Sequence, residues 1–388
     1  MAIPPNTSAV PLRVAHVYLS MPVGGAEDLT LGVMQQSPAE IKIVPVCLRE
    51  LGPVGEELKK QGKEIHLLPV APSKRFNLFG VFRLAGWLRE QGFAAVHTQV
   101  YNAHVYGLLA AWKAGIPGIM HHQKTFRGMK PHRLWMMKWL TRLAPAQITL
   151  SAQTKQDVCQ FLGARPERVA VLPNAVDTTL FRPPADRNAL RRQLQLPEHE
   201  FTAGTVASLT APKNHSANLQ MWAEVRRQGL AGRFLLCGEG GLRDDLTRLH
   251  AQLQLPSSFT FLGNQRPVHP WVQAMDVFVL CSTWEGQPLA ILQALACGKP
   301  VLASRIEGNV AVLGEAHPGL FDLEKPGDYA EKLLRAWREP AYREEILEYQ
   351  AAQSPRVPSV RDCARAFGEL YQRLHAARDL DGIGDLHL

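Results

Sequence analysis

The chain has 388 residues, more than one ordinary hydrophobic core holds, so its length predicts two domains. A composition of 46% hydrophobic and 20% charged residues is typical of a globular protein, and the absence of an 18-residue apolar run excludes a transmembrane helix. The N-terminal stretch lacks the apolar segment of a signal peptide, and the six cysteines form no CxxC pair. These features predict a cytoplasmic protein with reduced thiols, and the net charge of +8 favours an anionic ligand or surface.

Short hydrophobic runs alternate with longer helical stretches along the whole chain. In the first half, strands are expected at residues 13–19, 41–48, 64–70, 94–99, 118–122, 147–152 and 168–174. In the second half, they are expected at residues 201–209, 233–238, 259–263, 277–282 and 300–305. Several runs are apolar without alternation, as strands buried on both faces of a parallel sheet are. The repeated order of strand and helix therefore predicts doubly wound parallel α/β domains.

The alternation pauses between about residues 175 and 200, where Pro183, Pro184 and many charges indicate a linker. We therefore expect two Rossmann-like domains of similar size, residues 1–180 and 181–355, facing each other across a cleft. Ligands of such sheets bind beyond the carboxyl ends of the strands.

A basic segment without acidic residues lies in the first half. Between Gln91 and Gln156 the sequence has no Asp or Glu, and it mixes Lys and Arg with Trp135 and Trp139. Such a segment can be a core-facing helix with a solvated basic edge, a helix that lies on an anionic membrane, or the rim of a cleft for an acidic substrate.

Two glycine-rich turns follow strands and precede helices, GGAE at 24–27 and GEGG at 238–241. Glycine lets the backbone approach a ligand closely, and the free N–H groups of the next helix attract an anion. Each turn alone is an ordinary tight turn, and neither is a full GxGxxG. One turn per domain favours a cleft that holds a diphosphate.

The stretch TWEGQPLAILQALACGKPVLAS at 283–304 combines a loop, a helix and a strand. Pro288 is expected as the first helical residue and Gly298 as the residue that ends the helix. The first free N–H groups then belong to Leu289 and Ala290 and point to the ligand side.

Two polar residues accompany this helix. Glu285 precedes it, and Gln293 shares a face with Leu289 because the two are four residues apart. In the alternative interpretation, Glu285 is only a favourable charge near a helix N-terminus, and Gln293 is a helix residue with a local hydrogen-bond partner.

Residues 282–304 resemble the signature of glycosyltransferase family 4, retaining enzymes of the GT-B fold that use nucleotide-sugar donors. Further segments agree in order and spacing: GGAE at 24–27, VHTQ at 96–99, VAVLPNAVDTTLFRP at 169–183, VASLTAPKNH at 206–215, LLCGEGGLRDDL at 235–246 and FLGNQ at 261–265. The resemblance covers about residues 13–310. It also implies that the last segment, residues 356–388, forms a helix that crosses back to the first domain, followed by a frayed tail.

The resemblance implies catalytic roles for Glu285, which would contact donor-sugar hydroxyls, for Lys213, which would neutralise the leaving phosphate, and for His122. The donor-binding residues that it implies are Gly24, Gly25, Ser208, Gly238, Glu239, Gly286, Gln287, Pro288, Leu289, Ala290 and Gln293. The acceptor-side residues are His121, Gln123, Lys124 and Arg127. No metal is implied, because a helix dipole and a lysine take its place.

Three positions depart from the family's pattern. Gln293 stands where the family has a second Glu that accepts hydrogen bonds from both ribose hydroxyls, so charge-assisted strength is lost there. Ser208 replaces an Arg. A strict alignment puts Gln123 at the place of a His near the reacting sugar, and a one-residue shift favours His122.

The resemblance implies transfer of a sugar from a nucleoside-diphosphate sugar, most simply a UDP-sugar, to an acceptor hydroxyl with retained configuration. We expect a role in polysaccharide, lipopolysaccharide or glycolipid synthesis, with a glycan or lipid-linked acceptor and no nucleic acid. The protein is then cytoplasmic, or peripheral on the inner face of the cytoplasmic membrane. A non-catalytic nucleotide-sugar or glycan-binding protein and a nucleotide-sugar epimerase are the alternatives, and the scarcity of carboxylates in the first domain argues against the epimerase.

Overall fold

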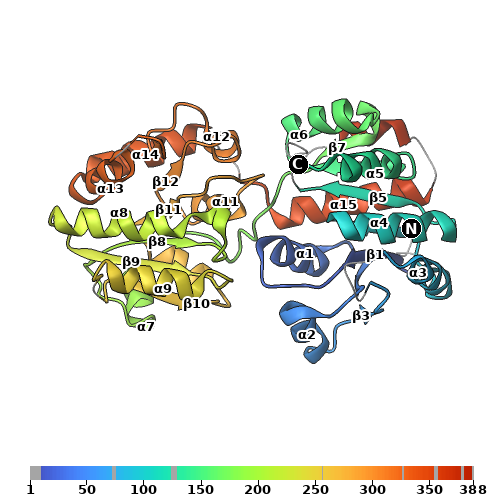
Figure 1. Ribbon diagram of the computed structural model, residues 1–388, viewed down its shortest axis with the longest axis horizontal. Helices are drawn as coiled ribbons and strands as arrows, with labels where there is room; N and C mark the ends of the chain where they lie inside the picture. The colour runs from blue at the N-terminus through green and yellow to red at the C-terminus, as the bar shows by residue number, and fades with distance from the viewer. Residues whose placement is uncertain are drawn as a thin grey trace, which may run out of the picture. The chain divides into compact units, whose positions relative to one another are not determined.

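The computed structural model describes residues 10–71, 76–123, 129–255, 257–325, 327–353, 357–376 and 380–386. The chain divides into two compact units (Figure 1). The N-terminal unit comprises Met1–Asn174 and Val360–Leu388, and the C-terminal unit comprises Ala175–Ser359. The chain crosses between the units after Asn174 and after Ser359. Close to these two points, Val176 forms a β-bridge with Ser359, and the Val176 amide donates to the Pro358 carbonyl at 2.9 Å.

The N-terminal unit is built on a parallel sheet of seven strands in the order β3-β2-β1-β4-β5-β6-β7. The strands are β1 Leu12–Tyr18, β2 Ile41–Cys47, β3 His66–Leu67, β4 Ala95–Thr98, β5 Gly118–His122, β6 Ala146–Thr149 and β7 Val169–Val171. Most of their side chains are buried, as the unbroken apolar runs predict. The predicted strand at 64–70 is much shorter, because β3 is an edge strand that pairs through only two residues.

Helices cover both faces of this sheet. They are α1 Gly25–Gln36, α2 Gly52–Lys60, α3 Leu78–Glu90, α4 Tyr101–Ala114, α5 Pro131–Thr141, α6 Ala152–Asp157 with the π-helical turn η1 Val158–Leu162, and α15 Val360–His375. Right-handed crossovers place α3, α4 and α5 on one face and α1 and α2 on the other. The C-terminal helix α15 packs against α1 and β4, so the end of the chain completes the N-terminal unit (Figure 1).

The C-terminal unit holds a parallel sheet of six strands in the order β10-β9-β8-β11-β12-β13. Its strands are β8 Phe201–Val206, β9 Gly232–Cys237, β10 Phe259–Gly263, β11 Val277–Leu280, β12 Val301–Ser304 and β13 Leu320–Phe321. Its helices are α7 Arg187–Gln193, α8 His215–Arg227, α9 Arg243–Gln252, α10 His269–Ala274, α11 Leu289–Ala296, α12 Glu307–Leu313, α13 Asp328–Arg338 and α14 Pro340–Gln353. Two doubly wound sheets confirm the predicted fold class.

The stretch expected as a linker, residues 175–200, is instead part of the C-terminal unit. It contains α7, whose residue Arg191 is fully buried and donates hydrogen bonds to the carbonyl groups of Ala274, Glu198 and Glu200. Arg191 also pairs with Asp276 at 2.8 Å. Charged residues of this segment thus form contacts inside the unit, which composition alone did not reveal.

None of the helices in the described ranges is long and apolar enough to span a bilayer.

Candidate functional site

A lysine and a glutamate meet at the carboxyl ends of β8 and β11 in the C-terminal unit. Lys213 Nζ lies 2.5 Å from Glu285 Oε1, and the Ser282 hydroxyl donates to the same oxygen at 2.6 Å. The Glu285 side chain is only 8% exposed. Its other carboxylate oxygen has no hydrogen-bond partner in the described part of the chain, so it can accept from a ligand.

Residues of β12 and α12 contact the loop that carries Glu285 and hold it in place. A Cβ atom on Gly308 would lie 2.4 Å from the Glu285 carbonyl oxygen, so only glycine allows this approach. The Ser304 hydroxyl donates to the Ser282 carbonyl at 2.5 Å, and Asn309 Nδ2 donates to the Ser304 carbonyl at 2.8 Å. These buried contacts hold the carboxylate in one position.

Helix α11 begins directly after this loop. Pro288 is its N-cap rather than its first helical residue, because the Pro288 backbone is extended. The first amide with an acceptor is that of Ile291, which donates to the Pro288 carbonyl at 3.1 Å. The N–H groups of Leu289 and Ala290 have no backbone acceptor in the described chain and remain open to an anion. As predicted, Gly298 follows the helix in a left-handed conformation.

Gln293 lies one turn after Leu289 on α11 and is 8% exposed. No hydrogen bond is formed by its side-chain amide within the described chain. The local partner considered from the sequence is therefore not observed. The amide atoms still reach solvent, so they are open to a polar ligand.

The GEGG turn at 238–241 lies against the loop that connects β8 to Lys213. A Cβ atom on Gly238, which has a φ of +149°, would lie 2.0 Å from the Ala207 carbonyl oxygen. The Leu209 amide donates to the Glu239 carbonyl at 3.0 Å. The GEGG turn thus packs tightly on the loop after β8. The Glu239 carboxylate pairs with Arg243 at 2.6 Å.

A buried chain of hydrogen bonds supports the loop around Ser208, whose own side chain is exposed. The Tyr329 hydroxyl donates to Asn218 Oδ1 at 2.6 Å, Asn218 Nδ2 lies 3.3 Å from His215 Nδ1, and His215 Nε2 lies 3.1 Å from the Ser208 carbonyl oxygen. Burial lowers the pKa of His215 to about 4, so its ring is neutral at pH 7 and carries its proton on Nε2. Sequence patterns did not point to Tyr329, because it lies 114 residues after His215.

In the N-terminal unit, Gly24 is the N-cap of α1 and Gly25 is its first residue. A Cβ atom on Gly24 would lie 2.7 Å from a carboxylate oxygen of Glu27. Burial raises the pKa of Glu27 to about 7. The first turn of α1 therefore carries acidic side chains, Glu27 and Asp28, beside the predicted donor-facing glycines.

The predicted histidines lie at the carboxyl end of β5. Both are buried, His121 at 3% and His122 at 2% exposure, and adjacent strand residues point to opposite faces of the sheet. His122 Nε2 lies 2.8 Å from Gln147 Oε1. Gln123 is only partly buried and donates from Nε2 to Gln99 Oε1 at 2.9 Å. The two remaining acceptor-side residues, Lys124 and Arg127, lie outside the described residues.

The two histidines belong to a larger buried group, which we call the histidine cluster: His16, His97, His104, His121 and His122. The Tyr371 hydroxyl of α15 lies 2.7 Å from His16 Nε2 and 2.7 Å from His97 Nδ1. Burial lowers the pKa of every member, to about 3 for His16 and His121 and to about 4 for His122. No group of three or more His, Cys, Asp or Glu in the described ranges is arranged to hold a metal ion.

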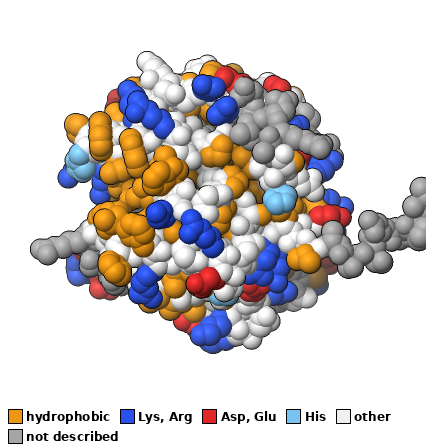
Figure 2. All heavy atoms as spheres, turned by 90° about the vertical axis from the view of Figure 1, so that its right-hand side faces the viewer, with side chains coloured by type: hydrophobic (Ala, Val, Ile, Leu, Met, Phe, Trp, Pro, Cys, Tyr) orange, Lys and Arg blue, Asp and Glu red, His pale blue; other side chains and the backbone are white. Residues whose placement is uncertain are grey.

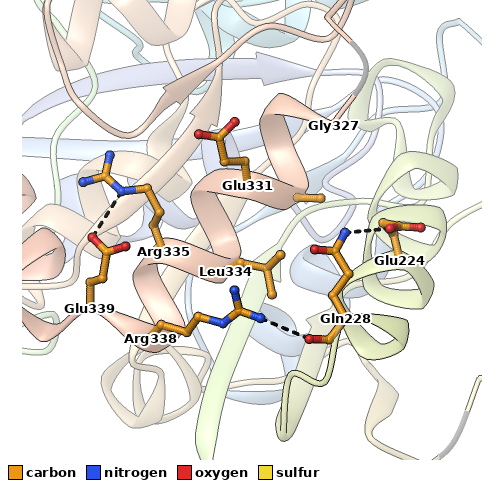
Figure 3. A pocket seen from close by; sticks show the side chains of 9 residues that line it. Glu224, Gln228, Gly327, Glu331, Leu334, Arg335, Arg338 and Glu339 are labelled. Carbon is orange, nitrogen blue, oxygen red and sulfur yellow. Dashed lines mark hydrogen bonds and ion pairs between the residues drawn. The ribbon is translucent and has the colours of Figure 1, made fainter.

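A shallow cavity of about 490 Å³ lies elsewhere in the C-terminal unit, between the carboxyl-terminal end of α8 and one side of α13 along its whole length (Figure 3). Its polar side chains mainly satisfy one another: Gln228 donates to Glu224, and Arg335 pairs with Glu339. Lys213 precedes the opposite end of α8, so this cavity is separate from the Lys213–Glu285 pair.

Comparison with known proteins identifies the family. Residues 23–180 match the family described as Glycosyltransferase Family 4, and residues 200–339 match the family described as Glycosyl transferases group 1. This chain is a family 4 glycosyltransferase. The match confirms the resemblance drawn from the sequence and, with it, the prediction of a glycosyltransferase.

Relatives of this glycosyltransferase span nearly its whole length. An Escherichia coli protein named UDP-Gal:alpha-D-GlcNAc-diphosphoundecaprenol alpha-1,3-galactosyltransferase is 26% identical over 84% of this chain and 87% of its own. The putative glycosyltransferase EpsF of Bacillus subtilis is 28% identical over 88% of this chain and 92% of its own.

The solved structures confirm the GT-B fold. The structure of the Anabaena protein HepE in complex with UDP and glucose matches with a TM-score of 0.78, at 21% identity, over 92% of this chain and 99% of that one. The lipopolysaccharide outer core galactosyltransferase WaaB matches with a TM-score of 0.61, at 14% identity, over 94% and 99% of the two chains.

Proposed function

We propose that this glycosyltransferase transfers a hexose from a UDP-sugar to a hydroxyl group of a lipid-linked glycan, with retained anomeric configuration. The observation that carries the proposal is the Lys213–Glu285 pair beside the open N-terminus of α11. The name of the Escherichia coli relative contains a UDP-sugar as the donor and a diphosphate-linked lipid as the acceptor. It supports this choice of donor and acceptor.

The donor diphosphate would bind at the start of α11. The open N–H groups of Leu289 and Ala290 and the positive end of the helix dipole attract an anion. Lys213 is 2.5 Å from Glu285 and supplies the cation that stabilises charge as the diphosphate leaves. The unpaired oxygen of Glu285 would then accept a hydrogen bond from a hydroxyl group of the donor sugar.

Gln293 would bind the ribose of the nucleotide. Its side-chain amide has one acceptor oxygen and two donor N–H positions, so it can bond both ribose hydroxyl groups without a charge. A neutral amide binds less strongly than the carboxylate that the family's pattern has here. We therefore expect the donor to bind through the diphosphate and the sugar more than through the ribose.

The chemistry that we propose is a front-face substitution. The bond between the anomeric carbon and the diphosphate oxygen breaks, the acceptor oxygen bonds to the same face, and the leaving diphosphate takes the acceptor's proton. Catalysis then rests on positioning and on stabilisation of the leaving group by Lys213 and α11, with no metal required.

His122 remains our proposed contact near the reacting sugar, with Gln123 as the second candidate. His122 is buried and bonded to Gln147, whereas Gln123 is partly exposed. The variant with the larger loss of kcat at unchanged thermal stability, His122→Asn or Gln123→Ala, identifies the residue that contacts substrate.

The test of the proposed function is a transfer assay with purified protein. Labelled UDP-galactose, UDP-glucose, UDP-N-acetylglucosamine and GDP-mannose are offered with a lipid-diphosphate-linked N-acetylglucosamine acceptor. We expect transfer from one UDP-sugar, an axial product linkage by NMR, and loss of transfer in Glu285→Gln. The matched control is Glu315→Gln, which breaks a surface pair with Arg305 in the same unit. Transfer only from GDP-mannose, or none from any donor, contradicts the proposal.

A further inference from the structure

The outer surface of α3, α4 and α5 in the N-terminal unit exposes large hydrophobic side chains. They are Leu78, Phe79, Phe82, Trp112, Trp135 and Trp139. Phe79 is 79% exposed and Trp135 is 66% exposed. We call this surface the aromatic face. Figure 2, which looks at the end of the N-terminal unit, shows hydrophobic side chains gathered on one side of the view with Lys and Arg beside them.

The three helices lie side by side on one face of the seven-stranded sheet, with α4 in the middle. Their inner sides already supply the core, through residues such as Leu84 of α3 and Leu140 of α5, which are fully buried. The exposed aromatic residues therefore add nothing to the core of the unit. Their spacing, three residues for Phe79 and Phe82 and four for Trp135 and Trp139, gives α3 and α5 each an outward apolar stripe.

The three helices that carry the aromatic face have a strongly one-sided charge. Helices α3, α4 and α5 with their caps carry seven cations: Arg83, Arg89, Lys113, Lys130, Arg133, Lys138 and Arg142. Their one carboxylate is Glu90, at the end of α3. The surface thus combines apolar side chains with an excess of positive charge.

The cations and the aromatic rings are interleaved rather than separated. Lys113 Nζ lies 5.7 Å from the centre of the Phe82 ring, and the Arg133 guanidinium lies 5.0 Å from the centre of the Tyr101 ring. On α5, Trp135, Lys138 and Trp139 fall on one stripe because three and four residues separate them. Aromatic rings next to long basic side chains suit a lipid interface, where rings enter the apolar layer and cations reach the headgroups.

We propose that the aromatic face docks this enzyme on an anionic lipid bilayer without spanning it. Anionic headgroups complement the seven cations, and the rings of Phe79, Phe82 and Trp135 enter the interface. A second copy of the chain suits this surface poorly, because a two-fold contact would oppose the same cations to each other. The inference goes beyond the proposed function, since it concerns neither donor nor acceptor.

The test uses the full-length protein and sedimentation with vesicles. We expect binding to vesicles of phosphatidylcholine with one third phosphatidylglycerol, and weak binding to pure phosphatidylcholine. The variant Lys138→Gln/Arg142→Gln should bind about 25-fold more weakly, because each cation near an anionic surface contributes about fivefold. The variant Phe79→Ser/Phe82→Ser/Trp135→Ser should lose binding at any salt concentration.

Matched controls separate this surface from general effects. Lys59→Gln/Lys60→Gln removes two exposed cations from α2, on the other face of the sheet, and Leu180→Ser/Leu323→Ser removes two exposed hydrophobic residues from the C-terminal unit. Both should bind vesicles like the wild type, as should Glu285→Gln, which tests the donor site instead. Unchanged binding of the aromatic variant, no binding of the wild type, or a dimer in solution that the aromatic variant dissociates overturns the proposal.

Discussion

The histidine cluster predicts that acid unfolds the N-terminal unit before the C-terminal unit. Its five rings are buried and neutral, and burial lowers the pKa of each well below the ordinary value of 6.5. In the unfolded chain the same rings take up protons as the pH falls through 6.5. The unfolded state then binds more protons than the folded state, so the stability of the unit falls as the pH falls.

The magnitude follows from these shifts. Between pH 7.5 and 5.5, each ring that stays neutral in the folded state lowers the free energy of unfolding by about 1.4 kcal/mol. Glu27 acts in the opposite direction, because its pKa is raised from 4.5 to about 7 and its proton binds to the folded state first. Its contribution offsets about 2 kcal/mol. The net loss is about 5 kcal/mol, comparable with the whole stability of a marginal domain.

Hydrogen exchange with peptide resolution measures the two units separately. We expect peptides from β1, β4 and β5 to lose about 5 kcal/mol of protection between pH 7.5 and 5.5, after correction for the intrinsic exchange rate. Peptides from β8, β9 and β11 should lose less, because burial lowers the pKa of only three described histidines of that unit, to about 4 for His215 and His317 and below its ordinary value for the partly exposed His269.

A single substitution tests the assignment. His104→Gln removes one titrating ring, so the acid-induced loss in the N-terminal unit should shrink by about 1.4 kcal/mol. The control His132→Gln removes an exposed histidine from α5 and should leave the loss unchanged. Protection of β1, β4 and β5 that stays constant or rises at pH 5.5 refutes the reasoning.

Three further predictions concern the donor site. Lys213→Ala should lower kcat about 100- to 1,000-fold, because a preorganised charge at the leaving group is lost; a loss confined to KM in steady-state kinetics contradicts this role. Gln293→Ala should weaken UDP binding about fivefold, as expected for one neutral hydrogen bond, and calorimetry that finds equal affinity excludes it from the nucleotide site. Tyr329→Phe should cost about 1–2 kcal/mol in stability by leaving Asn218 without its donor, and should raise the donor KM, because the loop at Ser208 loses support; a stability loss with unchanged KM assigns Tyr329 a purely structural role.

The fold could be predicted well from local patterns. Apolar runs marked the strands, and β5 has the predicted limits, Gly118–His122. Errors arose where tertiary contacts override composition. The charged stretch at 175–200 resembled a linker, yet Arg191 is buried against the carbonyl group of Ala274, 83 residues away, and against that of the nearby Glu200.

The donor site was only partly visible in the sequence. The order of the family's motifs assigned Lys213 and Glu285 to the same site, although the two residues are 72 positions apart in the sequence. The hydrogen bonds that hold them come from Ser282, Ser304 and Asn309, common polar residues without any distinctive spacing. The histidine cluster was also missed as a unit, because its members come from separate segments that meet only when the sheet forms.

The central claim is that the C-terminal unit binds a nucleoside-diphosphate sugar with Glu285 on the sugar. The most direct measurement is thermal unfolding of the wild type and of Glu285→Ala with UDP, GDP, ADP and their sugars, with and without EDTA. A ligand at 100 times its Kd stabilises the fold by about 2.7 kcal/mol, a readily measured shift. We predict an EDTA-independent shift with UDP in both proteins, and an extra shift with one UDP-sugar in the wild type alone. No shift with any nucleotide, or an equal response of Glu285→Ala to the sugar-bearing ligand, contradicts the claim.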